Sequence, residues 1–399
     1  MKSVYDEAQD TLRLCSSPGA ALASLVMKEG SAYRRPGACM LVWRDGARLG
    51  AISGGCLEAD VVERARALLD SGKTEYVVYD NRGDGEAMYE LGCHGVLGVL
   101  IEPLREETHR QFLDRRKALA QNRQWSVSAT VYRIAAGSPL REGQRMLVSR
   151  DSYWSTMEDA HAVEHIREES LDLLSRCEER PDAYAPGDIP SAYTMRCSQC
   201  GADVLLEPAP PPVKLLLVGA GEDAIPVAGA AAALGWEVAV ADHRPGFLTT
   251  DRFPMAASLL HGRPEEQTDL VSPDSRTACV VMTHHFEIDR GWLGRVLHSN
   301  AFYIGQLGPR KRTERIIESL NLAHGASAAP GLVRLYAPAG LDIGSETPEE
   351  IALAIVSEIQ AVLRAGSGLS LREARAREVE EHVERSDSTV AGLDEKCAV

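Results

Sequence analysis

The pattern of apolar and polar positions divides the chain into two halves of different type. In the second half, short apolar runs alternate with helical segments, which is typical of a parallel sheet with helices on both faces. We expect buried strands at residues 213–218, 237–241, 278–282 and 301–304. A helix rich in small residues is predicted at 226–234, and another begins after Thr347, with Pro348 and Glu350 in its first turn. The second half therefore predicts a doubly wound α/β domain.

The first half has the pattern of mixed β and α structure, and three of its segments recur at a nearly constant offset. The matching pairs are 23–31 with 129–138, 37–42 with 143–148, and 100–103 with 205–208. The offset is 106 residues from Met40 to Met146 and 105 residues in the third pair. Two copies of one unit produce such a pattern, and chance similarity between common β-turn-β segments is the alternative. We interpret this mixed α/β half as an internal duplication.

A Gly-Gly-Cys turn at 54–56 carries the clearest chemical signal of the first copy. A strand-like segment, 48–52, leads into it, and an amphipathic helix, 59–69, follows. Free N–H groups and the helix dipole favour an anion at such a turn, and the same field lowers the pKa of a thiol. A thiolate there suits a soft metal or a sulfur-transfer step, and a buried structural cysteine is the alternative. The second copy has 159–162 at this place, so we expect the first copy to be active and the second to be a scaffold.

The second half carries a dinucleotide-binding fingerprint. Gly219 and Gly221 follow the first strand at once and open a helix, and Asp242 ends the next strand. In this setting the glycines approach a diphosphate and the acid accepts from a ribose hydroxyl. Glu222 in the same loop opposes a diphosphate, and Arg244 offsets it. This half is therefore expected to be a Rossmann-like parallel sheet.

Other loops of this sheet should meet at the same edge, because ligands of open α/β sheets bind at the carboxyl ends of the strands. The candidate residues on these loops are His284, Asp289, Arg310 and Asp342. A hydrogen-bonded loop histidine is the alternative for His284, and a surface charge is the alternative for Arg310.

Composition narrows the possible partners. The chain has 399 residues and a formal net charge of −15, which argues against nucleic acid and anionic membranes as partners. No apolar run approaches membrane-spanning length. The nine cysteines have no framework spacing and residues 1–10 are polar, so we expect reduced thiols in the cytoplasm. Cys197 and Cys200 form a lone C-x-x-C, which we interpret as two incidental cysteines, since a zinc site would need a second pair.

The proline-rich segment 208–212 is predicted to be a stiff linker. The expected regions are the first copy of the repeat (1–105), its degenerate second copy (106–207), the linker (208–212), the Rossmann-like domain (213–366) and a charged tail (367–399).

Several motifs occur in an order that resembles one known family. They are SGGCLE (53–58), GCHG (92–95), VGAGEDAIPVA (218–228), YIGQLGPRKR (303–312) and GLDIGSETPEE (340–350). This series is similar to the xanthine dehydrogenase accessory factor family, XdhC/CoxI. Members are understood to bind molybdenum cofactor, protect it while its terminal sulfur ligand is installed, and pass it to a molybdenum hydroxylase. The resemblance implies a cofactor chaperone rather than a turnover enzyme.

The resemblance also implies roles for individual residues. Cys56 and Cys93 fall on family cysteines and are the candidate molybdenum contacts, whereas His94 and Glu222 depart from the family's glycine and histidine. With the motifs above, the candidate cofactor-binding residues are Gly54, Gly55, Cys56, Cys93, Gly219, Gly221, Asp242, Arg244, His284, Arg310 and Asp342. The candidates for a catalytic role are Cys56, His284 and Asp289.

The expected partners are a xanthine dehydrogenase-like molybdenum hydroxylase, a cysteine desulfurase and a second copy of the chain in a homodimer. The Rossmann-like domain would hold part of the cofactor or a nucleotide such as NAD(P). We further expect the Gly-Gly-Cys turn and the carboxyl edge of that sheet to share one cleft, within one chain or across a dimer. The alternatives for the whole protein are an NAD(P)-dependent oxidoreductase with His284 as acid–base, and a nucleotide-sensing regulator.

Overall fold

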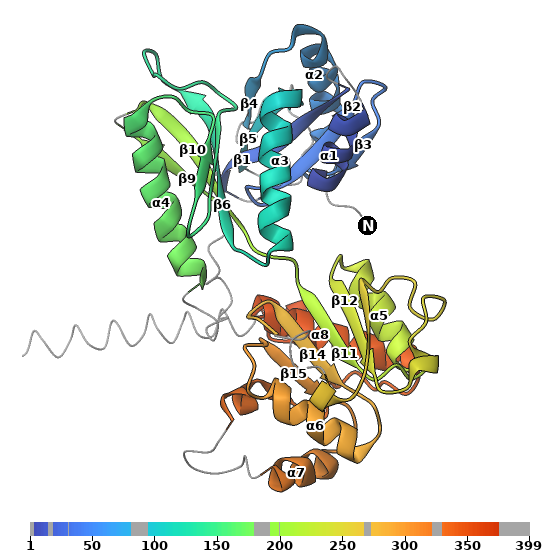
Figure 1. Cartoon of the computed structure of the whole chain (residues 1–399). Coiled ribbons are helices and arrows are strands. Elements are labelled where there is room, and N and C mark those ends of the chain that lie inside the picture. Colours follow the sequence, from blue (N-terminus) through green and yellow to red (C-terminus); the bar gives the residue numbers. More distant parts are fainter. Residues whose placement is uncertain are drawn as a thin grey trace, which may run out of the picture. The chain divides into compact units, whose positions relative to one another are not determined.

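The chain forms two compact units, which divide between Pro212 and Val213 (Figure 1). The computed structural model describes residues 4–14, 19–30, 32–80, 95–178, 192–198, 200–266, 273–320 and 329–374. The first unit contains two antiparallel sheets and the second contains one parallel sheet. The predicted α/β fold class is confirmed.

The first unit contains the same series of elements twice. The first series is α1 (Val4–Leu14), β1 (Ala20–Gly30), β2 (Cys39–Trp43), β3 (Arg48–Gly50), α2 (Glu58–Ser71), β4 (Glu75–Asp80) and β5 (Gly95–Pro103). The second is α3 (Glu106–Gln121), β6 (Ser126–Ile134), β7 (Arg145–Val148), β8 (Tyr153–Ser155), α4 (Ala160–Glu178), β9 (Tyr193–Cys197) and β10 (Ala202–Ala209). The sheet orders, β3-β2-β1-β5-β4 and β8-β7-β6-β10-β9, are equivalent. The two segments therefore have the matching strand order that a duplication requires.

The strand registers agree in detail. Ala23 pairs with Met40, and the residues 106 positions later, Ala129 and Met146, pair in the same way. The register of β1 against β5 shifts at Leu25/Met27, and the register of β6 against β10 shifts at the corresponding place. A β-bulge is a local feature that the architecture does not demand, so its repetition supports copies of one unit over chance similarity.

Each sheet of the first unit is covered on one face by its own helix, α2 or α4, which packs into an apolar core. The opposite faces meet α1 and α3. The two copies also touch directly through a small apolar cluster that takes equivalent residues from each: Val26, Leu100, Tyr132 and Leu205. The duplicated units therefore pack together as one body.

The second unit is a six-stranded parallel sheet. Its elements are β11 (Lys214–Val218), α5 (Ala224–Ala233), β12 (Glu237–Asp242), η1 (Pro245–Phe247), β13 (Ser258–His261), η2 (Pro264–Glu266), β14 (Thr277–Val281), α6 (Phe286–Val296), β15 (Tyr303–Gln306), α7 (Arg310–Ser319), η4 (Pro330–Arg334), β16 (Leu335–Tyr336) and α8 (Pro348–Arg364). The order β13-β12-β11-β14-β15-β16 is the doubly wound order of dinucleotide-binding folds. Helices α5 and α8 pack on one face and α6 and α7 on the other. Because both faces are covered, the central strands are apolar in successive positions, as the sequence pattern predicted.

The linker predicted at 208–212 is shorter in the structure. Pro208 and Ala209 belong to β10, where they pair with Val127 and Ser126 of β6. The ladder extends to these residues because the partner strand begins at Ser126. The other predicted region boundaries stay a prediction, and most of the charged tail lies outside the described residues.

Candidate functional site

The Gly-Gly-Cys turn between β3 and α2 is organised around the hydroxyl of Ser53. This oxygen accepts from the backbone N–H groups of Gly55 (3.2 Å) and Leu57 (3.3 Å) and from the Cys56 thiol (3.5 Å). The buried Glu58 carboxylate accepts from the Ser53 hydroxyl and, at 2.9 Å, from its N–H. Burial alone would raise the pKa of Glu58, but the hydrogen bonds from Ser53 outweigh it and the pKa lies below its ordinary value. The turn is thus built on an ionised internal carboxylate.

A cavity of about 490 Å³ lies beside this turn. Its lining residues are Tyr33, Arg48, Gly50, Ala51, Ser53, Gly54, Gly55 and Glu58. Gly55 has φ +115°, and a Cβ there would meet nothing within 4 Å, so its backbone faces open space. The half-buried Cys56 thiol borders this region through Ser53. Arg48 is the cation of the lining, and neither it nor the Ser53–Glu58 pair was assigned a role from the sequence.

The second copy lacks an equivalent turn. Helix α4 begins at Ala160, and the carboxylate of Asp159 accepts from the N–H of Ala162 at 2.8 Å. This side-chain cap takes the place that the glycine turn and thiol occupy in the first copy. The scaffold role expected for the second copy stays a prediction.

The cysteines are partly paired. Cys197 and Cys200 form a disulfide with their Cα atoms 5.4 Å apart, within the range that a disulfide requires. The expectation of reduced, incidental cysteines is therefore wrong at this pair, because the turn brings the two side chains together. Among the described residues, Cys39, Cys56, Cys177 and Cys279 are free, and no cluster of three or more ligating side chains is present. Cys93 and His94 lie outside the described residues.

The carboxyl edge of the parallel sheet contains the other predicted site. Gly219, with φ +111°, lies where the loops after β11 and β14 meet, at the point where the strand order reverses. A Cβ on Gly219 would lie 2.6 Å from the carbonyl oxygen of Met282, so only glycine fits. The glycine-rich loop and the loop after β14 thus contact one another directly.

Asp242 is a structural carboxylate rather than an open acceptor. It is 1% exposed and accepts from the N–H of Ala220 at 2.7 Å and from the backbone and guanidinium of Arg244. Burial alone would raise the pKa of Asp242, but the hydrogen bonds from Arg244 and Ala220 lower it by a larger amount. The pKa of Asp242 therefore lies below its ordinary value. A ribose hydroxyl would have to displace Arg244 to reach this carboxylate.

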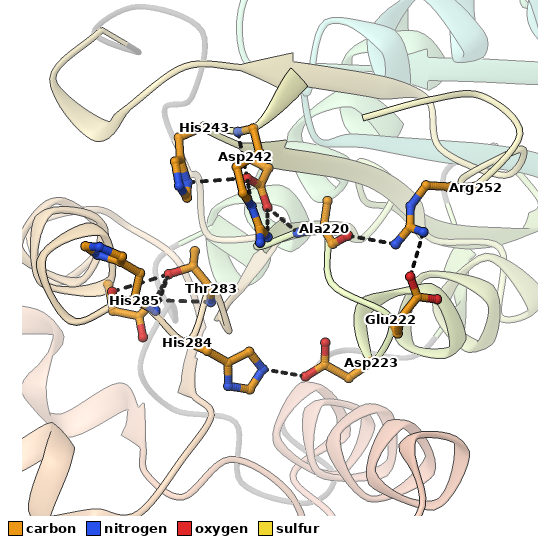
Figure 2. A network of polar contacts seen from close by, with 11 residues as sticks. Ala220, Glu222, Asp223, Asp242, His243, Arg252, Thr283, His284 and His285 are labelled. Atoms are coloured by element: carbon orange, nitrogen blue, oxygen red, sulfur yellow. Dashed lines mark hydrogen bonds and ion pairs between the residues drawn. The ribbon is translucent and has the colours of Figure 1, made fainter. Parts of the chain in front are cut away.

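The glycine-rich loop itself carries two carboxylates, each paired with a basic side chain from another loop (Figure 2). Glu222 pairs with Arg252 at 2.7 Å, and Asp223 pairs with Nε2 of His284 at 2.7 Å. His284 has a left-handed backbone, φ +60°, which is uncommon for a residue other than glycine. Both carboxylates of this loop are therefore already paired, whereas a diphosphate prefers free N–H groups and cations.

Behind His284 lies a buried polar network centred on Asp289. Its carboxylate accepts from the backbone and hydroxyl of Thr283, from the amide of Gln306 at 3.2 Å and from Arg312 at 2.7 Å. Asp289 is fully buried, so it holds the loop in place and does not face a ligand.

Two of the predicted residues, Arg310 and Asp342, lie on the surface. The side chain of Arg310 is 79% exposed and pairs with Glu314 one turn along α7, so the surface-charge alternative describes it. Asp342 is also exposed. Arg312, two residues beyond Arg310, is the member of this basic cluster that reaches the site network. No helix in the described part of the chain is long and apolar enough to cross a membrane.

Comparison with known proteins agrees with this architecture. Residues 215–359 match the XdhC Rossmann domain, and residues 16–80 match the XdhC and CoxI family. A crystal structure of a xanthine dehydrogenase from Bacillus halodurans aligns with a TM-score of 0.70 and 26% identity, over 91% of this chain and 96% of that one.

Two curated proteins are similar over most of the chain. A probable xanthine dehydrogenase subunit of Bacillus subtilis is 31% identical over 342 residues, which cover 85% of this chain and 92% of that protein. The molybdenum cofactor insertion chaperone PaoD of Escherichia coli is 22% identical over 360 residues, 88% of this chain and 85% of that protein. The chain belongs to the XdhC and CoxI family.

Proposed function

We propose that this protein is a chaperone that binds molybdenum cofactor and inserts it into a molybdenum hydroxylase of the xanthine dehydrogenase type. Family membership and the similarity to PaoD support this role. The observation that carries it is the half-buried Cys56 thiol, held by Ser53 beside an open cavity. The cofactor is here the cargo of the protein.

The residues of the turn fit this cargo. Molybdenum cofactor is anionic, with a phosphate and a dithiolene, and a soft sulfur ligand suits its metal. Gly54 and Gly55 leave the backbone accessible beside the cavity, and Arg48 supplies a positive charge. The negative charge of Glu58 would repel an anion, but its carboxylate already accepts two hydrogen bonds from Ser53, which stabilise that charge inside the turn. In this proposal Cys56 contacts the metal or carries a persulfide, and the cofactor is delivered in its sulfurated form.

For the carboxyl edge of the parallel sheet we propose a role in holding the remainder of the cofactor. Binding of NAD(P) there is the weaker alternative, because Asp242 is occupied by Arg244 and the loop carries Glu222 and Asp223. The pairing with Asp223 is the one observation that supports a catalytic role for His284. The proposal also includes a cysteine desulfurase as a partner and a homodimer as the state of the protein. Its location in the proposal is the cytoplasm.

The test is co-purification of cargo with the full chain. The protein would be expressed with an active cofactor pathway, purified gently, and assayed for molybdenum and for the fluorescence of the oxidised pterin. We expect both in the wild type and a strong loss in Cys56→Ser. Cys177→Ser is a matched control, because this half-buried cysteine lies on α4 of the second copy and burial raises its pKa to about 11. Wild-type protein without pterin and molybdenum, or equal retention in Cys56→Ser, would contradict the proposal.

A further inference from the structure

The contact between the two copies of the first unit contains two carboxylates, the buried Glu102 and the partly buried Glu207. On one side, Glu102 of β5 reaches into the other copy, where Arg145 of β7 donates to it at 2.6 and 2.5 Å and His109 of α3 lies at 2.9 Å. On the other side, Glu207 of β10 reaches into the first copy and accepts from Tyr5 of α1 at 3.3 Å. The two carboxylates hold equivalent positions.

The glycines that face these carboxylates are equivalent as well. A Cβ on Gly143 would lie 3.4 Å from Glu102, and a Cβ on Gly37, which is 106 residues earlier, would lie 3.6 Å from Glu207. The interface therefore has two related sides that began alike and now differ in what surrounds each carboxylate.

On the Glu207 side, an aromatic ring takes up the space. The guanidinium of Arg116 lies 4.1 Å from the centre of the Tyr5 ring and also pairs with Glu207 at 3.3 Å. Cys39 stands at the position of Arg145 and bonds to the Tyr5 hydroxyl at 3.3 Å. Burial raises the pKa of both Tyr5 and Cys39, so this side is a packed, uncharged arrangement around one ion pair.

On the Glu102 side, the structure has a cavity of about 570 Å³. It is lined by Gly72, Lys73, Thr74, Glu102, Arg105, Thr108, His109, Ile134, Arg141, Glu142, Gly143, Gln144 and Thr156. Both copies contribute, since Lys73 and Thr74 lie between α2 and β4 whereas Arg141 and Gln144 lie between β6 and β7. A molecule in this cavity would contact both copies at once.

The floor of the cavity is electrically neutral. Burial opposes the charge of Glu102, but Arg145 and His109 outweigh it and bring the pKa of Glu102 down to about 2. Burial lowers the pKa of His109, and its Nδ1 accepts from the N–H of Arg105 at 3.0 Å, so the imidazole is neutral. The negative charge of Glu102 is therefore neutralised by the positive charge of Arg145.

The rim of the cavity is cationic. Lys73 and Arg105 take part in no ion pair within the described part of the chain, and the guanidinium of Arg105 donates to the carbonyl of Gly72 at 3.0 Å. Arg141 lies 3.8 Å from Glu158, and both side chains are largely exposed. The lining thus contains these three cations and one carboxylate, Glu142, that forms no ion pair among the described residues.

We propose that this cavity is a second binding site, separate from the Cys56 turn, for a small anion that carries phosphate or carboxylate groups. Arginine and lysine form charge-assisted hydrogen bonds with both kinds of group, and the threonine hydroxyls of the lining add neutral donors. The bound anion bridges the copies, so it stabilises the first unit by binding only its folded form.

Isothermal titration of the full-length protein tests the site, with pyrophosphate and citrate as separate probes at constant ionic strength. We expect one saturable site for at least one probe, and the tighter probe identifies the anion class. Loss of each cation weakens binding about tenfold, so Lys73→Gln/Arg105→Gln weakens it about a hundredfold. Arg66→Gln, which removes an exposed arginine on α2 away from the cavity, is the control with wild-type affinity.

Two further measurements separate the alternatives. Cys56→Ser keeps wild-type affinity for the anion, so failure of the cofactor-chaperone proposal leaves this one standing. Circular dichroism and the melting temperature without ligand show that the double variant is folded, since both side chains are at the rim. No saturable binding of either probe to the wild type, or wild-type affinity in the double variant, would overturn the proposal.

Discussion

The ion pair of Glu102 and Arg145 joins the two copies, and its removal gives the sharpest test of how they are held together. Both side chains are buried, at 2% and 7% exposure, and two hydrogen bonds link them. Glu102→Gln keeps the shape of the side chain but leaves the Arg145 charge buried without its partner. Breaking one side of a buried pair typically costs about 3–5 kcal/mol.

The pKa of Glu102 supports a similar magnitude. It lies at about 2 instead of 4.5. At about 1.4 kcal/mol for each pKa unit, this difference corresponds to about 3 kcal/mol. Because the folded-state pKa is lowered, the stabilisation is fully present above pH 4.5 and is lost as the pH falls from there toward 2. The wild type should therefore lose stability in this acidic window, and Glu102→Gln should lose less.

Scanning calorimetry of the full chain, with hydrogen exchange followed in peptides from β5 and β7, measures the effect on this unit. Glu207→Gln is the control, because its carboxylate has the equivalent position but is 18% exposed and its arginine is 3.3 Å away. We expect a smaller loss there. Equal losses in the two variants, or a change below about 1 kcal/mol in Glu102→Gln at neutral pH, would refute the reasoning.

Three further predictions concern the second unit. Asp289→Asn should destabilise it by about 1–3 kcal/mol and speed hydrogen exchange after β14, because an NH2 donor replaces one of the two oxygens that accept from buried donors; unchanged exchange would contradict this. Gly219→Ala should prevent stable folding of the unit, whereas Gly235→Ala, with φ +80° but open space, should cost about 1 kcal/mol, as thermal melting would show. Arg310→Ala should change stability by less than about 0.5 kcal/mol and Arg312→Ala by clearly more in the same assay, since the latter charge pairs with buried Asp289; the reverse order would contradict the assignment.

Positions where local chemistry decides the structure were predictable from the sequence. The apolar runs of the second half become strands covered on both faces, and Gly219 lies at the tight turn that its motif predicts. The offset of 106 residues also predicted the equal strand order of the two sheets, because each copy keeps its own pattern of apolar positions.

The partners of the charged side chains were decided only by the tertiary structure. Arg310 and Arg312 stand two residues apart in one basic cluster, yet one is in solvent and the other contacts buried Asp289. Asp242 was expected to face a ribose and instead holds Arg244 and the glycine-rich loop. Residue type does not decide these contacts, because an arginine or an aspartate can pair with several kinds of partner. The packing of the helices and strands decides which partner lies within reach.

The contact between the copies illustrates the same limit. Glu102 and Arg145 are separated by 43 positions and lie in different copies, so no local pattern pairs them. The duplication predicted two similar copies. Whether each side of the contact between the copies is filled or contains a cavity depends on a few side chains. Tyr5 packs on one side and three cations surround a cavity on the other, and this difference exists only once the two copies are packed together.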